Sequence, residues 1–222
     1  MEEKMAKNEN VAGNFNYNKI EKKNKNFMYK NLLRSKCYNS NFSNSNFDYA
    51  SFRGAHFKAC TFFGCTFKWA EFIGTNLKSS VFKNAIFENT VFDSVNLDGA
   101  NFQDAKFKNT IFLSSNTEKA KNLNLEDLNI RIFHEMPQLE ISEELEMAVK
   151  NIMKNDYVKK ARVFDTKDGD LNVLNLMILL DNFDETTLIK GLNIIEVQLD
   201  RDFYTLSYII KLLKNYQIDG TL

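Results

Sequence analysis

A five-residue period runs through the middle of the chain and leaves few folds open to it. From Phe42 to Phe112 every fifth residue is Phe or Leu, without a miss. Two positions before each of them stands a small or short residue, such as Ala50, Ala55 or Cys60. A period of five matches neither a helix, with about 3.6 residues per turn, nor a strand, with its alternation of about two. It matches a solenoid in which each five-residue unit turns one corner.

The units resemble those of the pentapeptide-repeat family, whose pattern is A(D/N)LxX. They read ANFQD at 100–104, AKFKN at 105–109 and AEFIG at 70–74, and the likeness covers about 25–117. The resemblance implies a right-handed quadrilateral parallel β-helix with four units per coil. It also implies that the large central residue and the small residue two before it point inward. This chain departs from the pattern in its use of Phe for Leu, and of Lys, Thr or β-branched residues for Asp or Asn.

The inward phenylalanines are expected to form columns along the solenoid axis. A coil of four units holds twenty residues, and stacked strands lie about 4.8 Å apart. Residues twenty apart should therefore stack on one another inside the tube. We predict two neighbouring interior columns, which comprise Phe47, Phe67, Phe87 and Phe107, and Phe52, Phe72, Phe92 and Phe112.

Charge and pattern change together near residue 117. Residues 25–117 carry a net charge of +5, residues 118–222 carry −6, and the five-residue period stops near Asn116. We predict an N-terminal tail and cap at 1–24, including the apolar Val11, and the β-helix at 25–117. A capping and linker segment at 118–137, with a helix over 124–135, and a C-terminal domain at 138–222 should follow. No apolar run is long enough to span a membrane, and the N-terminus lacks the apolar core of a signal peptide, so a cytoplasmic protein is expected.

The C-terminal domain is predicted to be a small α/β unit in the order αββαβα. Helices are expected after Ser142, after Asp184 up to Gly191, and from Phe203 onward. Strands are expected at 158–164, 171–180 and 193–199, with a hairpin turn at 165–170. A buried helix would show the same apolar pattern as 171–180, but the preceding turn favours a strand.

This stretch also resembles the C-terminal domain of the SseB-type (enhanced serine sensitivity) family. The likeness rests on VKKARVF, the DGD turn, NLMILLDNFDE and NIIEVQLDRDF. The resemblance implies no defined chemistry.

Stacking the coils at twenty residues predicts which outward side chains are neighbours. One column, Asp48, Lys68, Glu88 and Lys108, should form a surface ladder of ion pairs. The next column begins Tyr29, Tyr49 and Trp69 and continues as Asn89 and Asn109. These three aromatic residues either stabilise the sheet by cross-strand stacking or lie beneath the N-terminal segment, or they form a surface that binds a partner.

Several outward positions toward the C-terminal coils are apolar. We expect the second domain to dock on them; they are Val81, Ile86, Val91, Ile111 and Leu113.

The residues do not form a recognisable catalytic, metal or cofactor site. Cys37, Cys60 and Cys65 occupy inward positions and are interpreted as small apolar fillers. The two histidines are an outward solenoid residue, His56, and His134 outside the repeats. We therefore predict no metal, no cofactor and no catalytic residue.

The favoured function is a non-enzymatic protein-interaction module with an unknown partner. The alternative comes from the family resemblance, because some pentapeptide-repeat proteins mimic DNA and protect type II topoisomerases from inhibitors. A mimic needs a strongly negative rod, which the net charge of +5 over 25–117 disfavours. Binding to nucleic acid is disfavoured too, because the basic residues are scattered over four faces. A homodimer through the Tyr29, Tyr49 and Trp69 strip or through the final helix is a third possibility.

Overall fold

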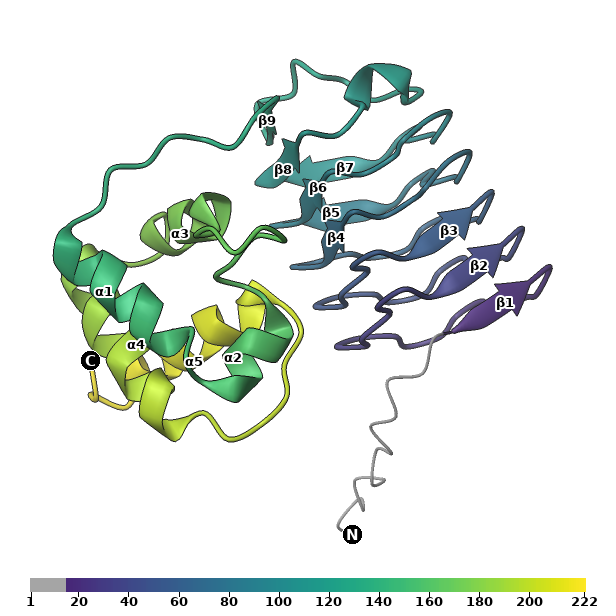
Figure 1. The fold of residues 1–222 in the computed structure, drawn as a ribbon. Coiled ribbons are helices and arrows are strands. Elements are labelled where there is room, and N and C mark those ends of the chain that lie inside the picture. The colour runs from purple at the N-terminus through teal and green to yellow at the C-terminus, as the bar shows by residue number, and fades with distance from the viewer. Residues whose placement is uncertain (1–14) are drawn as a thin grey trace, which may run out of the picture.

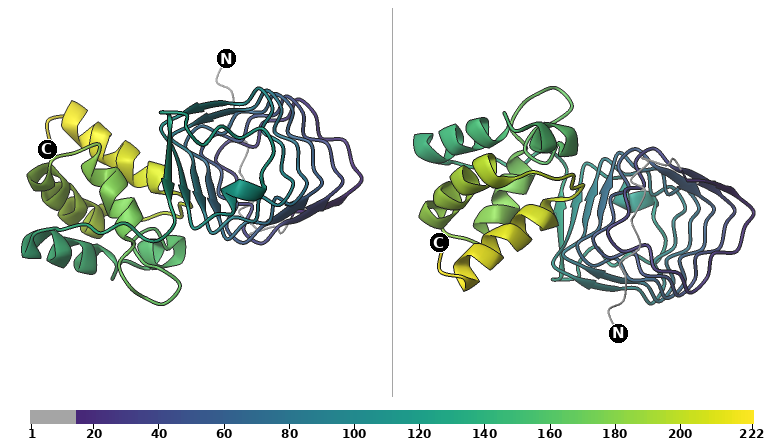
Figure 2. Two further views of the ribbon diagram at one scale, coloured as in Figure 1. Left: turned by 90° about the horizontal axis from the view of Figure 1, so that it is seen from above. Right: turned by 90° about the horizontal axis from the view of Figure 1, so that it is seen from below.

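The chain forms a square solenoid of parallel strands, with a bundle of helices packed against one of its sides (Figures 1 and 2). The computed structural model describes residues 15–222, so the expected tail around Val11 lies outside the described residues. The solenoid makes about six turns. The predicted β-helix followed by a small C-terminal domain is therefore confirmed.

Each coil pairs with the next at a register of twenty residues. Cys37 pairs with Phe57, Phe92 with Phe112, and Phe112 with Ile132, all in parallel. One side of the tube contains β1 (Asn16–Asn18), β2 (Lys36–Tyr38) and β3 (His56–Lys58), and another contains β5 (Ile86–Glu88) and β7 (Lys106–Lys108). The side that meets the helices contains β4 (Glu71–Ile73), β6 (Val91–Asp93), β8 (Thr110–Leu113) and β9 (Ile130–Phe133).

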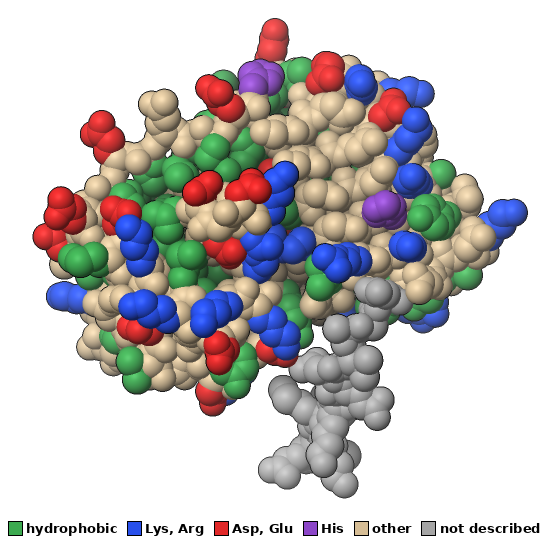
Figure 3. Space-filling view, viewed as in Figure 1, with side chains coloured by type: hydrophobic (Ala, Val, Ile, Leu, Met, Phe, Trp, Pro, Cys, Tyr) green, Lys and Arg blue, Asp and Glu red, His purple; other side chains and the backbone are tan. Residues whose placement is uncertain are grey.

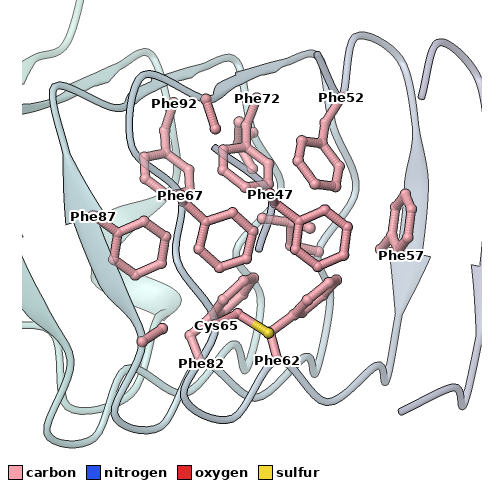
Figure 4. Packing of buried hydrophobic residues seen from close by; sticks show 14 of the residues in the cluster. Phe47, Phe52, Phe57, Phe62, Cys65, Phe67, Phe72, Phe82, Phe87 and Phe92 are labelled. Atoms are coloured by element: carbon pink, nitrogen blue, oxygen red, sulfur yellow. The ribbon is translucent and has the colours of Figure 1, made fainter. Parts of the chain in front are cut away.

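The interior consists largely of stacked phenylalanine rings (Figure 4). In the column that contains Phe67, ring centroids lie 5.4 Å from Phe47 and 5.0 Å from Phe87, and the planes are within 9° of parallel. In the next column, the rings of Phe72 and Phe92 lie 4.7 Å apart. Remaining members continue these stacks, namely Phe107 on Phe87, Phe52 on Phe72, and Phe112 on Phe92. The distance between stacked rings is close to the distance between neighbouring strands. Phenylalanine can therefore occupy the same interior position in successive coils.

The inward small residues satisfy the backbone at the corners. The Thr75 hydroxyl donates to the carbonyl of Phe52 at 2.8 Å, and the Cys65 thiol donates to that of Phe42 at 3.1 Å. Burial raises the pKa of Cys65 to about 12 and that of Cys60 to about 11. Thiols that remain protonated are poor nucleophiles, and these two act as hydrogen-bond donors in the core.

The ladder extends beyond both limits of the five-residue period. At the start, Phe15 and Tyr17 already pack against the core. At the end, the helix expected over 124–135 is wrong, because β9 continues the ladder on β8 after a short 3-10 turn, η1 (Thr117–Lys119). Backbone pairing needs only an apolar inward residue in each strand, and Ile130 and Ile132 supply it without a phenylalanine.

The C-terminal domain is helical rather than α/β. Its elements are α1 (Glu143–Ile152), α2 (Asp156–Ala161), α3 (Val173–Leu180), α4 (Glu185–Gln198) and α5 (Leu206–Ile218). The helices after Ser142 and Asp184 and the final helix are confirmed, as is the turn at 165–170, which an antiparallel bridge from Asp165 to Leu171 closes. None of the helices within 15–222 combines the length and the apolar character needed to cross a bilayer.

The three strands predicted in this domain are wrong, and helix caps explain why. Asn155 accepts from the Tyr157 N–H at the start of α2, and Asn172 accepts from the Asn175 N–H at the start of α3. These bonds satisfy N–H groups at the start of each helix, which in a strand would bond to a neighbouring strand. The segment 193–199 is the end of α4, which runs through Gly191. The αββαβα order is therefore replaced by five helices, and the SseB-type resemblance, which rested on those strands, stays unconfirmed.

Candidate functional site

The helices cover the side of the solenoid formed by β4, β6 and β8. The outward side chains of Val91, Ile111 and Leu113 are buried in the same cluster as the helix residues. The docking expected at these three residues is confirmed. It is wrong for Ile86, which is 45% exposed on β5, and Val81 also lies on another side and is only half-buried.

A carboxylate of the solenoid caps a helix of the C-terminal domain. Glu71 Oε1 accepts from the backbone N–H of Leu206 at 2.6 Å, and Thr205, the N-cap residue of α5, makes no side-chain cap bond of its own. Two further contacts join the same parts. The Arg53 guanidinium donates to the Arg162 carbonyl at 3.2 Å, and Arg131 pairs with Asp181 at 2.8 Å.

Glu71 is the most perturbed carboxyl at this junction. It is 5% exposed, and burial raises its pKa to about 7, against the opposing effects of Arg53 and of the Leu206 N–H. Burial also raises the pKa of nearby Asp93. Such a carboxyl is a candidate catalytic base when it faces a substrate cavity. The cavity beside Glu71 holds about 20 Å³, which is enough for a water molecule and too small for a substrate. The geometry therefore favours a structural role.

The structure divides the predicted aromatic strip into two parts. The rings of Tyr29 and Tyr49 stack with centroids 4.8 Å apart and planes at 15°. Trp69, one coil further, packs against the helical cluster and lines the small cavity beside Glu71. Tyr29 and Tyr49 stack, and the segment that covers Trp69 is the C-terminal domain, whereas the N-terminal segment was the cover expected. Tyr29 is the exposed member of the strip, at 53%, while Tyr49 and Trp69 are half-buried.

Tyr29 and Tyr49 form one wall of a groove whose other wall comes from the helical domain. That wall consists of the loop before α5 and the first turns of α5. The groove has a volume of about 300 Å³, and its helical side is lined by Asp202, Phe203, Tyr204, Thr205, Ser207, Tyr208 and Lys211. Tyr29 and Tyr49 of the strip thus face the final helix within a single chain. The strip and this helix were the two surfaces considered for a dimer.

The aromatic corner residues share the left-handed backbone that recurs at the last position of most five-residue units, as at Arg34, Ala59 and Ser79. Tyr29, Tyr49 and Trp69 have φ values of 60°, 61° and 55°. Left-handed backbone of this kind costs an ordinary L-residue roughly 1–2 kcal/mol, and Gly or Asn tolerates it best. The same column continues as Asn89 and Asn109, which also have positive φ and are hydrogen-bonded to each other at 2.7 Å. Asparagine can therefore occupy the positions of this column that hold aromatic residues in the earlier coils.

The predicted ion-pair ladder is present in its central part. Glu88 lies between Lys68 at 3.4 Å and Lys108 at 3.1 Å. The hydrogen bond from Lys108 lowers the pKa of Glu88. Asp48 instead accepts from the backbone N–H of Lys68 at 2.8 Å. The ladder is exposed and has no cavity, so it stabilises the surface rather than forming a site.

Two groups of residues at the junction were not identified from sequence. The first is the pair Glu71 and Arg53, although stacking at twenty residues already places charged positions beside the apolar Val91 and Ile111. The second is the helical wall of the groove, because the predicted α/β order misplaced the segment before α5. The run Phe203-Tyr204 just ahead of a helix was the available signal for this wall.

Comparisons with known proteins identify the repeats. A family model described as pentapeptide repeats matches with eight copies, at 40–78 and 76–112. Comparison with curated proteins gives no match.

Among solved structures, the chain is similar to HetL, a pentapeptide repeat protein involved in heterocyst differentiation regulation from the cyanobacterium Nostoc sp. strain PCC 7120. Identity is 18%, the match covers 46% of this chain and 45% of HetL, and the TM-score is 0.27. The chain thus spans less than half the length of HetL. It is also similar to a pentapeptide repeat protein from the Arabidopsis thaliana thylakoid lumen, with 19% identity, coverage of 72% and 88%, and a TM-score of 0.28. A third is QnrB1, a plasmid-mediated fluoroquinolone resistance protein, with 14% identity, coverage of 60% and 96%, and a TM-score of 0.25.

Proposed function

Because residues 40–112 are pentapeptide repeats wound into a β-helix, we propose that this protein is a non-enzymatic interaction module that binds a protein partner at the groove beside Tyr29 and Tyr49. The observation that carries the proposal is the placement of these two rings. The two rings stack on each other, and they lie across an open groove from further aromatic residues.

The composition of the groove supports a protein partner. Aromatic residues, above all Tyr, are enriched at protein interfaces, where they combine a large apolar area with a polar end. Tyr29 is 53% exposed, so much of its ring is available for contact. The perturbed carboxyl Glu71 does not favour an enzyme, because its cavity is limited to about 20 Å³. We place the protein in the cytoplasm as part of this proposal, since its three cysteines are free thiols.

Protection of a topoisomerase by DNA mimicry is the less favoured function. The side of the rod that carries Glu71 and Asp93 is covered by helices. In Figure 3, basic and acidic side chains are mixed over the solenoid half of the visible face, unlike the uniformly negative surface of DNA. A gyrase supercoiling assay with a quinolone tests this alternative, and protection at stoichiometric protein would reverse the preference.

Affinity capture from the native cell tests the proposal. The bait is the full chain, compared with Tyr29→Asn/Tyr49→Asn, which removes both rings and keeps a residue suited to the backbone. Phe63→Ser is the matched control, because Phe63 is a 38% exposed aromatic residue on another side of the solenoid. We expect a partner that the wild-type and control baits retain and the Asn variant loses, and that binds again when purified. Equal capture by all three baits would place the partner elsewhere and contradict the proposal.

A further inference from the structure

The groove has aromatic rings on both walls. Tyr29 and Tyr49 stack on the solenoid side, and Phe203 and Tyr208 stack on the helical side with centroids 5.2 Å apart and planes at 23°. Tyr204 also lines the groove, whose volume is about 300 Å³. This volume is at the lower end for a ligand pocket, so it fits a short segment rather than a folded element.

Four tyrosine hydroxyls around the groove are free to hydrogen-bond to a ligand. Within residues 15–222, the hydroxyls of Tyr29, Tyr49, Tyr204 and Tyr208 make no side-chain hydrogen bond. Burial raises the pKa of Tyr49 and Tyr204, so both remain O–H donors at neutral pH. A ligand that combines apolar rings with acceptor groups would complement these hydroxyls and the aromatic walls.

The charged side chains that line the groove are Asp202 and Lys211. Asp202 is neutralised by Lys160, whose ammonium lies 2.7 Å from its carboxylate. Lys211 forms no salt bridge with any acid in the described part of the chain, and its ammonium lies 6.0 Å from the centroid of the Tyr29 ring. An acidic group on the ligand would complement this ammonium.

The backbone geometry excludes one common mode of peptide binding at this groove. A peptide cannot add to the solenoid wall as a strand, because the Tyr29 and Tyr49 N–H groups already donate to Asp48 and Lys68 carbonyls at 3.0 and 2.7 Å. A polyproline II segment does not depend on such pairing. It has no internal hydrogen bonds, so its carbonyls accept from tyrosine hydroxyls while its proline rings pack on aromatic faces.

We propose that this groove binds a proline-rich segment of the partner in the polyproline II conformation, with an acidic residue of that segment beside Lys211. The inference rests on the proposed function, since it names the kind of segment that the interaction module recognises.

The test uses the purified full chain and an array of proline-rich decapeptides that differ in flanking charge. A matched array replaces each proline by alanine. We expect binding to the proline array, strongest for peptides with a flanking Glu or Asp, and little binding to the alanine array. Tyr29→Asn/Tyr49→Asn should weaken the best peptide by about tenfold or more, since two aromatic contacts are lost. Lys211→Gln should remove the preference for acidic flanks, and Phe63→Ser should change nothing.

The outcomes separate this inference from the proposed function. No binding to the proline array, or binding that the Asn variant and Lys211→Gln leave unchanged, overturns the inference. If cellular capture still depends on Tyr29 and Tyr49 in that case, the interaction module stands and the partner uses another kind of segment. Far-UV circular dichroism of each variant establishes that a loss of binding reflects the groove rather than unfolding.

Discussion

Phe67 contacts aromatic rings in every direction inside the tube. Its ring lies 5.4 Å from Phe47 and 5.0 Å from Phe87 along the column, and 5.4 Å from Phe72 at the next corner. It is fully buried, so the close packing around it leaves nothing to fill a deletion.

Phe67→Ala should lower the free energy of unfolding by about 3–5 kcal/mol, because it removes buried ring surface and leaves a cavity. Phe63→Ala is the control, since Phe63 points outward and is 38% exposed; its cost should stay within about 1 kcal/mol. Urea unfolding followed by circular dichroism measures both. Equal costs would mean that the rings do not form the core.

Glu71 should make the protein less stable as pH rises toward neutrality. Burial raises its folded pKa to about 7 from an ordinary value of 4.5. Between these values the folded state binds more protons than the unfolded state, so stability is greatest below pH 4.5 and is lost as pH rises through about 7. The loss amounts to roughly 3 kcal/mol at most. Asp93, whose pKa is also raised, contributes in the same direction.

Glu71→Gln should remove most of this dependence. The amide oxygen still accepts from the Leu206 N–H, and no proton is exchanged between pH 5 and 8. We expect the urea midpoints of wild type and variant to be close at pH 5, with the variant more stable at pH 8. Glu88→Gln is the control, because Lys108 lowers the pKa of Glu88, whose contribution is lost only as pH falls below 4.5. Parallel midpoint curves for wild type and Glu71→Gln would show that Glu71 titrates normally.

At the scale of elements, the five-residue period predicted the strands correctly, whereas apolar composition did not predict the elements of the C-terminal domain. The spacing of five requires the same inward residue at every corner, so the strands and their register of twenty follow from it. The strands predicted in 138–222 rested on apolar content, which a buried helix shares. Val197 decides the case at 193–199: a strand would bury it with Ile195 and Leu199, whereas it is 82% exposed on α4.

Only the part of the candidate site that lies on the solenoid could be predicted from the sequence. Stacking at twenty residues places Tyr29 beside Tyr49, and both do stack. Neither the cover over Trp69 nor the opposite wall of the groove follows from any spacing. Both depend on how α5 docks, and the docking includes the hydrogen bond that the Leu206 N–H donates to Glu71, 135 residues away in sequence.

Gly191 offers a test of helix packing. A Cβ built there would clash with Cδ2 of Leu213, a fully buried side chain of α5. Ala stabilises an exposed helix interior by about 1 kcal/mol over Gly, but overpacking costs about 1–3 kcal/mol. We therefore expect Gly191→Ala to lower the melting temperature.

Lys190→Ala on the exposed side of α4 is the control for Gly191→Ala, and it should be nearly neutral. Adding Leu213→Ala should recover part of the loss in a double-mutant cycle. If Gly191→Ala raises the melting temperature, α4 and α5 are packed less closely than the clash between a Cβ at 191 and Leu213 implies.

At the scale of the whole molecule, one apolar side of the rod joins its two parts. Val91, Ile111 and Leu113 belong to the helical core rather than to the interior of the tube. The phenylalanine columns lie on the other face of the same strands. A change on the outward face should therefore separate the parts without emptying the tube.

Ile111→Asp should undock the helical domain. It places an unpaired carboxylate where the side chain is 2% exposed, a change that typically costs more than about 4 kcal/mol. Trp69, the only tryptophan, packs against the helical domain, so its emission should shift to the red. Hydrogen exchange should speed up in peptides from 143–218 and stay slow in those from 40–112.

Ile86→Asp is the matched control for Ile111→Asp. Both isoleucines precede an inward phenylalanine in their five-residue units, but Ile86 is 45% exposed on β5. The control should therefore leave Trp69 emission and exchange unchanged. If Ile111→Asp speeds exchange equally in both parts, the solenoid and the helices unfold as one cooperative unit. If it changes neither signal, the contact at β6 and β8 does not hold the domains together in solution.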